Sequence, residues 1–113
     1  MKTIIAGSRT IENYNLIKEA TRDCGWKITE VVCGMAKGVD SLGMRWAQEK
    51  KIPVAQFPAK WTEFGTRAGY LRNVEMSKYA DCLILIWDGE SRGSKMMKDI
   101  AEKKGMKIWE LKL

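Results

Sequence analysis

The chain has 113 residues, a formal net charge of +6 and no histidine, with 45% hydrophobic and 30% charged residues. This length suits one domain over residues 1–113 with a buried core, and the composition is that of an ordinary globular protein. The lack of histidine excludes a Ser-His-Asp triad, a Cys-His dyad and a histidine-bound zinc site.

The spacing of apolar residues predicts strands and helices that alternate along the chain. In chain order we expect strand Lys2–Ala6, helix Glu12–Cys24, strand Glu30–Cys33, helix Val39–Lys50, strand Pro53–Phe57, a loop of about ten residues after Pro58, helix Ala68–Tyr79, strand Cys82–Trp87, helix Arg92–Lys104 and strand Lys107–Leu111. Apolar strands separated by helices belong in a parallel sheet that is covered on both faces. The expected fold is therefore an α/β, three-layer Rossmann-like domain.

Three glycine-rich polar loops follow the first, second and fourth strands, and the first contains Gly7, Ser8 and Arg9. Glycine lets the backbone approach a ligand closely, and the arginine fork suits phosphate or carboxylate. The loop could equally be a plain turn in which Thr10 caps the first helix.

The second loop places small residues directly before a helix. Its candidate ligand-binding residues are Gly34, Ala36, Lys37, Gly38 and Asp40. Small side chains leave the backbone N–H groups uncovered, and a helix N-terminus carries about half a positive charge, so this loop predicts an anion site. Three roles stay open for Asp40, which could accept ribose hydroxyls, hold magnesium through water, or stabilise the first helical turn.

The third loop has the same character. Its candidate residues are Asp88, Gly89, Ser91, Gly93 and Ser94. The glycines permit a nest of backbone N–H groups, and the serine hydroxyls can donate to phosphate oxygens. Ser91 could alternatively be only a helix cap.

The sheet order is expected to be 3-2-1-4-5, because this order places strands 2, 1 and 4 side by side and so joins the three loops into one pocket. The flavodoxin-like order 2-1-3-4-5 would separate them with strand 3 and is the alternative. In the preferred order the segment 59–70 crosses the mouth of the pocket. Trp61, Phe64 and Tyr70 could then stack on a base, or they could pin this loop to the body of the domain.

Taken together, GSR at 7–9, GMAKGVDSLGMRWA at 34–47, LRNVEM at 71–76 and WDGESRGSK at 87–95 resemble the SLOG superfamily. The nearest similarity is to its small YspA-like group, which is related to the DNA-processing protein DprA/Smf and to the LOG phosphoribohydrolases. The resemblance covers nearly the whole chain. It implies a Rossmann-like domain that binds nucleotides or nucleotide-derived signals.

The LOG enzymes carry an arginine in a helix motif HxRK, followed by PGGxGTxxE, whose glutamate serves cleavage of the N-glycosidic bond. Against that pattern Arg72 falls on the arginine, Gly93 and Ser94 fall on the GT pair, and Met97 falls on the glutamate. A thioether cannot act as a general acid or base. We therefore expect Arg72 to clamp a phosphate and Asn73 to hydrogen-bond sugar or base.

The sequence thus predicts a nucleotide-binding module that acts as a sensor or a sequestering protein. One alternative is a LOG-like hydrolase of an N-glycosidic or phosphate bond, with Arg72, Asp40 and Asp88 as candidate catalytic residues and Glu75 or Glu90 as other sources of a carboxylate. Another is single-stranded nucleic-acid binding, suggested by the net charge and by the kinship to DprA, which would weaken steeply with salt. A surface ion pair with Glu75 or another acid is the structural alternative for Arg72.

No metal site of the protein's own is expected, although magnesium could accompany the nucleotide. Cys24, Cys33 and Cys82 are expected to be buried thiols, because they are odd in number and widely spaced. No signal peptide or membrane helix is expected, so we expect a cytoplasmic protein. A homodimer or a larger homo-oligomer is also expected, because a core this small can leave apolar residues exposed. The residues considered for this surface are Trp109, Leu111, Leu113, Met96 and Met97.

Overall fold

Strands and helices alternate along the whole chain in the computed structural model, which describes residues 1–113. In chain order the elements are β1 (Lys2–Gly7), α1 (Tyr14–Asp23), β2 (Glu30–Cys33), α2 (Val39–Glu49), β3 (Val54–Gln56), α3 (Trp61–Phe64), the 3₁₀ helix η1 (Gly65–Arg67), α4 (Ala68–Tyr79), β4 (Cys82–Trp87), α5 (Arg92–Lys103) and β5 (Lys107–Lys112). The strands and the four longer helices match the predicted elements, with boundaries that differ by a few residues.

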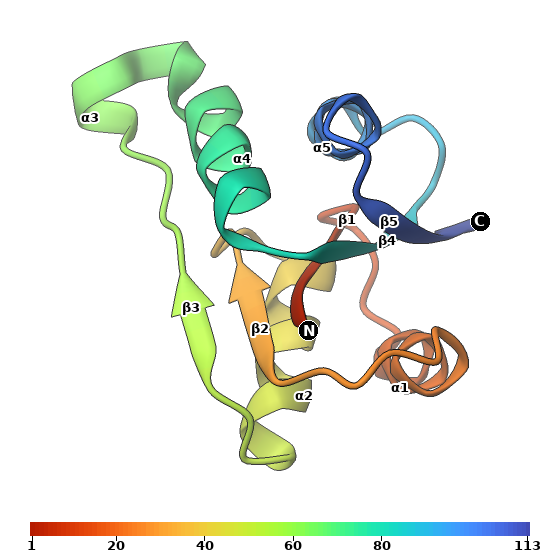
Figure 1. The fold of residues 1–113 in the computed structure, drawn as a ribbon. Coiled ribbons are helices and arrows are strands. Elements are labelled where there is room, and N and C mark those ends of the chain that lie inside the picture. The colour runs from red at the N-terminus through yellow and green to blue at the C-terminus, as the bar shows by residue number, and fades with distance from the viewer.

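The five strands form one parallel sheet in the order β3-β2-β1-β4-β5 (Figure 1). The predicted order is therefore confirmed, and the flavodoxin-like alternative is not the one observed. β1 is the middle strand, and every residue of its neighbour β4 is buried. Because parallel strands share a direction, the loops after β1, β2 and β4 leave the sheet from the same edge.

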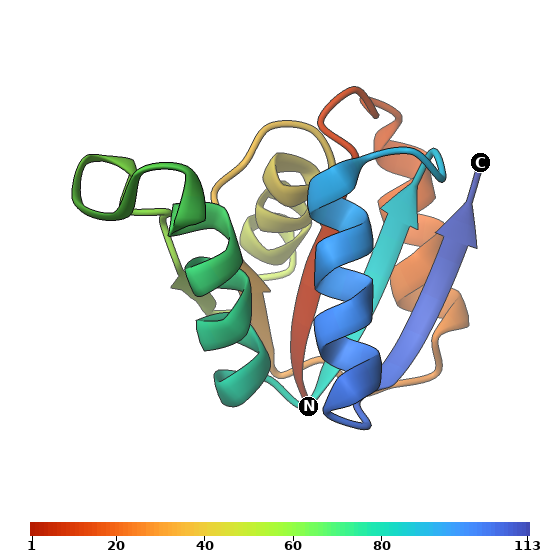
Figure 2. The ribbon, with the colours of Figure 1, turned by 90° about the horizontal axis from the view of Figure 1, so that it is seen from above.

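Helices cover both faces of the sheet, which gives three layers (Figure 2). α1 and α2 lie on one face, and α4 and α5 lie on the other. Successive side chains of a strand point to opposite faces. Ile5 accordingly packs in the core beneath α1 and α2, whereas its neighbour Ile4 packs beneath α4 and α5.

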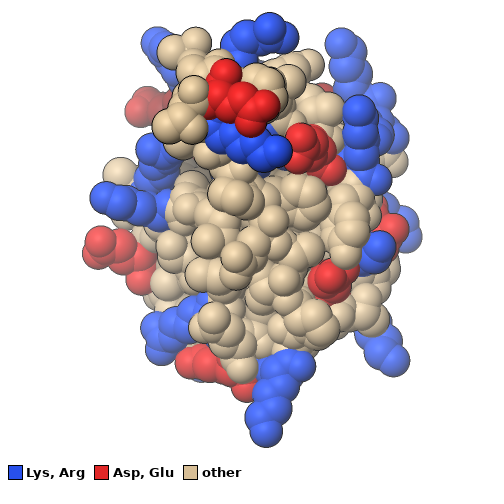
Figure 3. Space-filling view, turned by 90° about the vertical axis from the view of Figure 1, so that its left-hand side faces the viewer, with Lys and Arg blue, Asp and Glu red and all other residues tan.

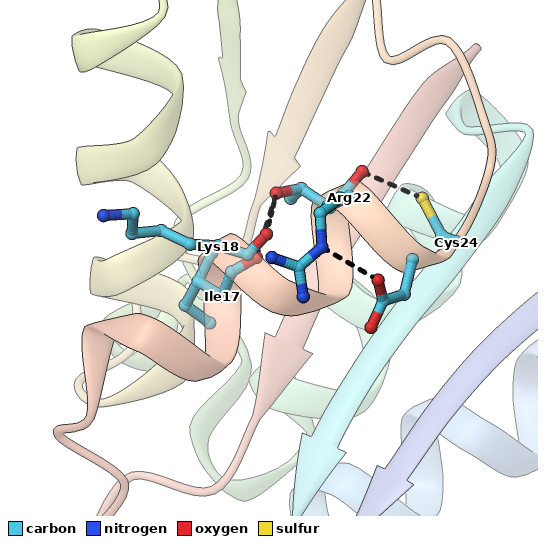
Figure 4. A network of polar contacts seen from close by, with 6 residues as sticks. Ile17, Lys18, Arg22 and Cys24 are labelled. Carbon is cyan, nitrogen blue, oxygen red and sulfur yellow. Dashed lines mark hydrogen bonds and ion pairs between the residues drawn. The ribbon is translucent and has the colours of Figure 1, made fainter.

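Helix α1 begins later than the sequence predicts. Its N-cap is Asn13, whose side chain accepts a hydrogen bond from the backbone N–H of Asn15 at 3.1 Å, so Thr10 does not cap it. The last turn of α1 is closed by local polar contacts (Figure 4). There the Thr21 hydroxyl donates to the carbonyl oxygen of Ile17, and the Cys24 thiol donates to that of Thr21.

The segment between β3 and α4 differs from the prediction of a loop. Residues 61–67 form the short helix α3 and the 3₁₀ helix η1, and Gly65 at their junction has a φ of 59°. A helix of four residues is too short to show an apolar period, because one period of an amphipathic helix spans 3.6 residues. The helical turns of α3 and η1 lead directly into α4, which begins at Ala68.

Several of the apolar residues considered for an oligomer surface lie in the core. Met97 is buried, and Trp109 and Leu111 pack against the core beneath α1 and α2. Met96 is half-buried, while Leu113 is 60% exposed. Fewer of these apolar side chains are exposed than the sequence predicts. The oligomeric state stays a prediction.

The side of the molecule that carries β3 and α3 has an uncharged centre (Figure 3). Lys and Arg side chains lie round the rim of this face, with Asp and Glu among them, and they form no continuous basic stripe there. All three cysteines are free thiols, with Cys33 and Cys82 buried and Cys24 half-buried. None of the helices is both long enough and apolar enough to span a bilayer.

Candidate functional site

Ser8 joins the three glycine-rich loops by hydrogen bonds. These loops leave the sheet at the carboxyl ends of β1, β2 and β4 (Figure 2). Its carbonyl oxygen accepts a hydrogen bond from the backbone N–H of Val39, the first residue of α2, at 3.3 Å. Its hydroxyl oxygen accepts from the backbone N–H of Asp88, which follows β4, at 3.0 Å. Since Ser8 itself follows β1, this one buried residue holds all three loops together.

Two glycines make the close approach of these loops possible. A Cβ on Gly7 would overlap the carbonyl oxygen of Ile86 and lie 2.9 Å from Cγ2 of Val39. A Cβ on Gly38 would lie 2.7 Å from Cα of Arg9, and Gly38 has a φ of 73°, which side-chain-bearing residues rarely adopt. Both glycines thus let one loop approach another, and Gly7 also lines the hollow that these loops enclose.

The joined loops enclose a hollow of about 280 Å³, which we call the first hollow. It lies between the carboxyl end of β1 and the start of α2 on one side and the middle of α4 and the start of α5 on the other. The residues that line it are Ala6, Gly7, Arg9, Ala36, Asp40, Arg72, Asn73, Met76, Ser91, Arg92, Gly93, Ser94 and Met97. Three arginines and a single carboxylate, that of Asp40, are among them, so its charge favours an anion.

The N-terminus of α5 forms one wall of the first hollow. Its N-cap is Ser91, whose hydroxyl oxygen accepts from the backbone N–H of Ser94 at 3.4 Å and from the Ser94 hydroxyl at 3.0 Å. The backbone N–H groups of Arg92 and Gly93 have no acceptor in the protein. Free N–H groups at the start of a helix, with the positive end of the helix dipole, suit an anionic group.

Asp40 is the acidic residue of the first hollow and is 5% exposed. Its burial raises the pKa of its carboxyl group to about 6, although Arg72, the backbone N–H groups of Ala36 and Gly7, and Arg9 each oppose this rise. Its Oδ2 accepts from the N–H of Ala36 at 3.4 Å. This bond connects the start of α2 to the preceding loop. It is a structural role, similar to the stabilisation of the first helical turn that the sequence suggests as one role of Asp40.

Arg72 is held in place by its own hydrogen bonds. Its Nη1 donates to the carbonyl oxygen of Gly34, and its Nε donates to Oδ1 of Asn73 at 2.9 Å. The pKa of Arg72 is lowered, mainly by burial and to a smaller extent by the nearby Arg9. Asp40 and Cys33 oppose this shift. Arg72 forms no ion pair with Glu75, so the structural alternative predicted for it is not observed.

A second hollow of about 320 Å³ adjoins the first on the side of α3, and we call it the second hollow. The two share Arg9, Ala36 and Arg72 in their walls. The other residues that line the second hollow are Gly34, Met35, Lys37, Pro58, Ala59 and Trp61. Phe64 and Tyr70 do not line it.

The predicted site residues fall into three groups. Those in the wall of the first hollow are Gly7, Arg9, Ala36, Asp40, Arg72, Asn73, Ser91, Gly93 and Ser94. Gly34 and Lys37 line the second hollow only. Four others line neither hollow, namely Ser8, Gly38, Asp88 and Gly89. The structure thus brings most of the predicted residues together around one space.

Asp88, a candidate for ligand binding and catalysis, shapes the third loop from outside the first hollow. Its Oδ1 accepts from the backbone N–H of Glu90 at 2.8 Å and of Ser91 at 2.9 Å. These two bonds are the main reason why the pKa of the Asp88 carboxyl lies below its usual range. Gly89 turns the chain next to it with a φ of 84°.

Sequence reasoning did not select four residues that line the first hollow. Ala6, Met76 and Met97 contribute apolar side chains from β1, α4 and α5, and Arg92 contributes a third guanidinium. An apolar residue that lines a hollow has the same sequence pattern as one in the core, so periodicity does not mark Ala6 or Met76, and Met97 was marked only by its alignment with the glutamate of the LOG enzymes. Arg92 could have been found, because it opens a helix directly after the glycine-rich third loop.

The first hollow has few side chains that could bind a metal ion. The structure has no group of three or more His, Cys, Asp or Glu side chains that could hold a metal ion together. Magnesium and calcium prefer several oxygen ligands, and Asp40 supplies one carboxylate. The residues present therefore do not fit a metal ion held by the protein alone.

The fold and the hollow define the class of protein as a Rossmann-like α/β domain with an arginine-lined hollow at the carboxyl edge of its sheet. The model of the YspA, cpYpsA-related SLOG family matches residues 1–64, and the chain belongs to this family. The match contains the first two glycine-rich loops, whereas Arg72 and α5 lie beyond it. A search of curated proteins finds no significant match, and neither does a search of solved structures. Membership in this family indicates a nucleotide-related function in the broad sense.

Proposed function

We propose that the protein binds a nucleotide or a nucleotide-derived small molecule, as a sensor or a sequestering module, with a phosphate in the first hollow. One observation carries this proposal. The first hollow combines three arginines with the free backbone N–H groups of Arg92 and Gly93, against one carboxylate. Guanidinium groups and helix N-termini are the usual partners of phosphate in proteins.

Binding is favoured over hydrolysis by what lines the first hollow. The position that aligns with the catalytic glutamate of the LOG enzymes, Met97, lies in its wall and carries no ionisable group. Glu75, Asp88 and Glu90, the other acids considered as a source of a carboxylate, lie outside it. A magnesium ion that accompanies a nucleotide would take its remaining ligands from phosphate oxygens and water.

Calorimetric titration of mononucleotides, cyclic nucleotides and ADP-ribose tests the proposal. The decisive variant is Arg9→Ala, because Arg9 is exposed, lines both hollows and has no side-chain hydrogen bond within the protein. We expect it to weaken binding about tenfold or more through loss of a charge-assisted contact. Arg22→Ala is the matched control, since it removes the same charge from an exposed site on α1. If no nucleotide binds at millimolar concentration, the proposal is wrong.

A second candidate function is cleavage of an N-glycosidic or phosphate bond with Asp40 as the proton-transfer group. It is favoured by the pKa of about 6 that burial gives the Asp40 carboxyl in a hollow it shares with Arg72. Chromatography of nucleotides incubated with the protein tests this candidate. Hydrolysis would yield product with the wild type and none with Asp40→Asn or Arg72→Ala. Equal traces of product from all three proteins would exclude it.

A further inference from the structure

Trp61 differs from the other tryptophans of the chain in its exposure. Trp46 and Trp87 are buried and Trp26 and Trp109 are half-buried, whereas Trp61 is 51% exposed. It also lines the second hollow. An exposed indole stabilises the core little, so pinning the segment to the domain does not explain its position.

The indole of Trp61 nevertheless has a fixed neighbour. A Cβ on Gly69 would lie 3.4 Å from Cη2 of Trp61, so the far edge of the ring lies against the first turn of α4. A Cβ at Gly69 would be in ordinary van der Waals contact with the ring. One edge of the ring is therefore supported, while half of the residue's surface is open to solvent.

Met35 is a second unusual residue of the same hollow. Its φ is 65°, in the left-handed region that residues other than glycine seldom adopt, and its side chain is exposed. Backbone strain of this kind tends to persist at ligand sites. Here it places a flexible, polarisable thioether in the wall that Trp61 and Pro58 also line.

The two hollows differ in chemistry and share part of their walls. The first hollow is lined by three arginines and no aromatic residue, and the second is lined by the indole of Trp61. Arg9, Ala36 and Arg72 belong to both walls, so the two spaces lie next to each other. We infer that the second hollow is the base subsite, in which a purine or pyrimidine stacks on Trp61 while the phosphate occupies the first hollow.

This inference rests on the proposed function and names the ligand as one with a heterocyclic base. It is tested by calorimetry with the four ribonucleoside 5′-monophosphates and with ribose 5-phosphate, which lacks the base. We expect Trp61→Ala to lower the affinity for the nucleotides about tenfold, because stacking on an aromatic side chain contributes strongly to the binding of a base. The affinity for ribose 5-phosphate should not change, and Trp61→Phe should keep most of the nucleotide affinity.

Phe64→Ala is the matched control, because Phe64 is an exposed aromatic residue of the same short helix and does not line the second hollow. It should bind nucleotides as the wild type does. Nucleotide binding that is equal in the wild type and Trp61→Ala would overturn the base subsite and leave the proposed function intact. A wild type that binds neither the nucleotides nor ribose 5-phosphate would overturn both.

Discussion

The hydroxyl oxygen of Ser8 accepts a hydrogen bond from the backbone N–H of Asp88 at 3.0 Å and so joins two loops that are 80 residues apart in the chain. The carbonyl oxygen of Ser8 binds the start of α2 in the same region. The walls of the first hollow therefore depend on a serine that does not itself line the hollow. A residue of this kind holds the ligand-binding groups in register with one another.

We predict that Ser8→Ala loosens the third loop while the fold is kept. Loss of the acceptor leaves the Asp88 N–H without a partner, which costs about 1–2 kcal/mol of unfolding free energy. Urea denaturation measures this cost, and hydrogen exchange at the Asp88 amide should become faster. Ser77→Ala is the control, because that buried hydroxyl donates only to the Val74 carbonyl of its own helix. Equal stability losses in the two variants would contradict the role given to Ser8.

We predict that Gly7→Ala destabilises the protein severely. The new methyl group would overlap the carbonyl oxygen of Ile86, where β1 pairs with β4, so these two neighbouring strands would have to separate at their carboxyl ends. We expect a loss of more than about 3 kcal/mol or no recovery of folded protein, measured by urea denaturation and circular dichroism.

Gly93→Ala is the matched control for this prediction, since a Cβ at Gly93 meets no atom within 4 Å. Its stability should be unchanged or higher by up to about 1 kcal/mol, because alanine favours a helix. A Gly7→Ala protein as stable as Gly93→Ala would show that the loops do not pack as closely as described.

The sheet order could be predicted because three polar loops had to meet at one edge of a sheet whose strands are separated by helices. The apolar run Cys82–Trp87 marked a strand buried on both faces, and it is buried throughout. Helix α3 escaped prediction because four residues carry no period. The helices and strands could therefore be predicted wherever an element was long enough for its apolar pattern to repeat.

The individual site roles were less predictable than the site. Asp88 and Asp40 both follow a strand beside glycines, yet the Asp88 carboxylate binds its own loop outside the hollow and Asp40 is buried in the wall. The difference lies in the direction of each side chain, which depends on loop conformation and not on residue type. Met76 and Met97 line the hollow with an apolar pattern that also describes a core.

We predict that Asp40 gives the stability of the protein a pH dependence between about 6 and 4. Burial raises the pKa of this carboxyl in the folded state to about 6, from its ordinary value of 3.8. As the pH falls through 6, the folded state takes up the proton before the unfolded state does, so folding becomes more favourable. Wild type should gain on the order of 3 kcal/mol relative to Asp40→Asn between pH 7 and pH 4.

Urea denaturation of both proteins at several pH values measures this difference. The comparison with Asp40→Asn cancels the titration of every other carboxyl group and leaves that of Asp40 itself. A difference between the two proteins that stays constant from pH 7 to pH 4 would show that the Asp40 carboxyl titrates normally in the fold.

We predict that the same proton controls anion affinity. Asp40 is the single carboxylate in the wall of the first hollow and titrates beside Arg72 and Arg9, so its charge opposes an incoming anion above pH 6. Sulfate is the suitable probe, because its own charge does not change over this range as that of phosphate does. Sulfate should bind the wild type more tightly as the pH falls through 6, whereas Asp40→Asn should bind it with little pH dependence. Calorimetry between pH 5 and pH 8 measures both curves, and parallel curves for the two proteins would place the anion away from Asp40 and outside the first hollow.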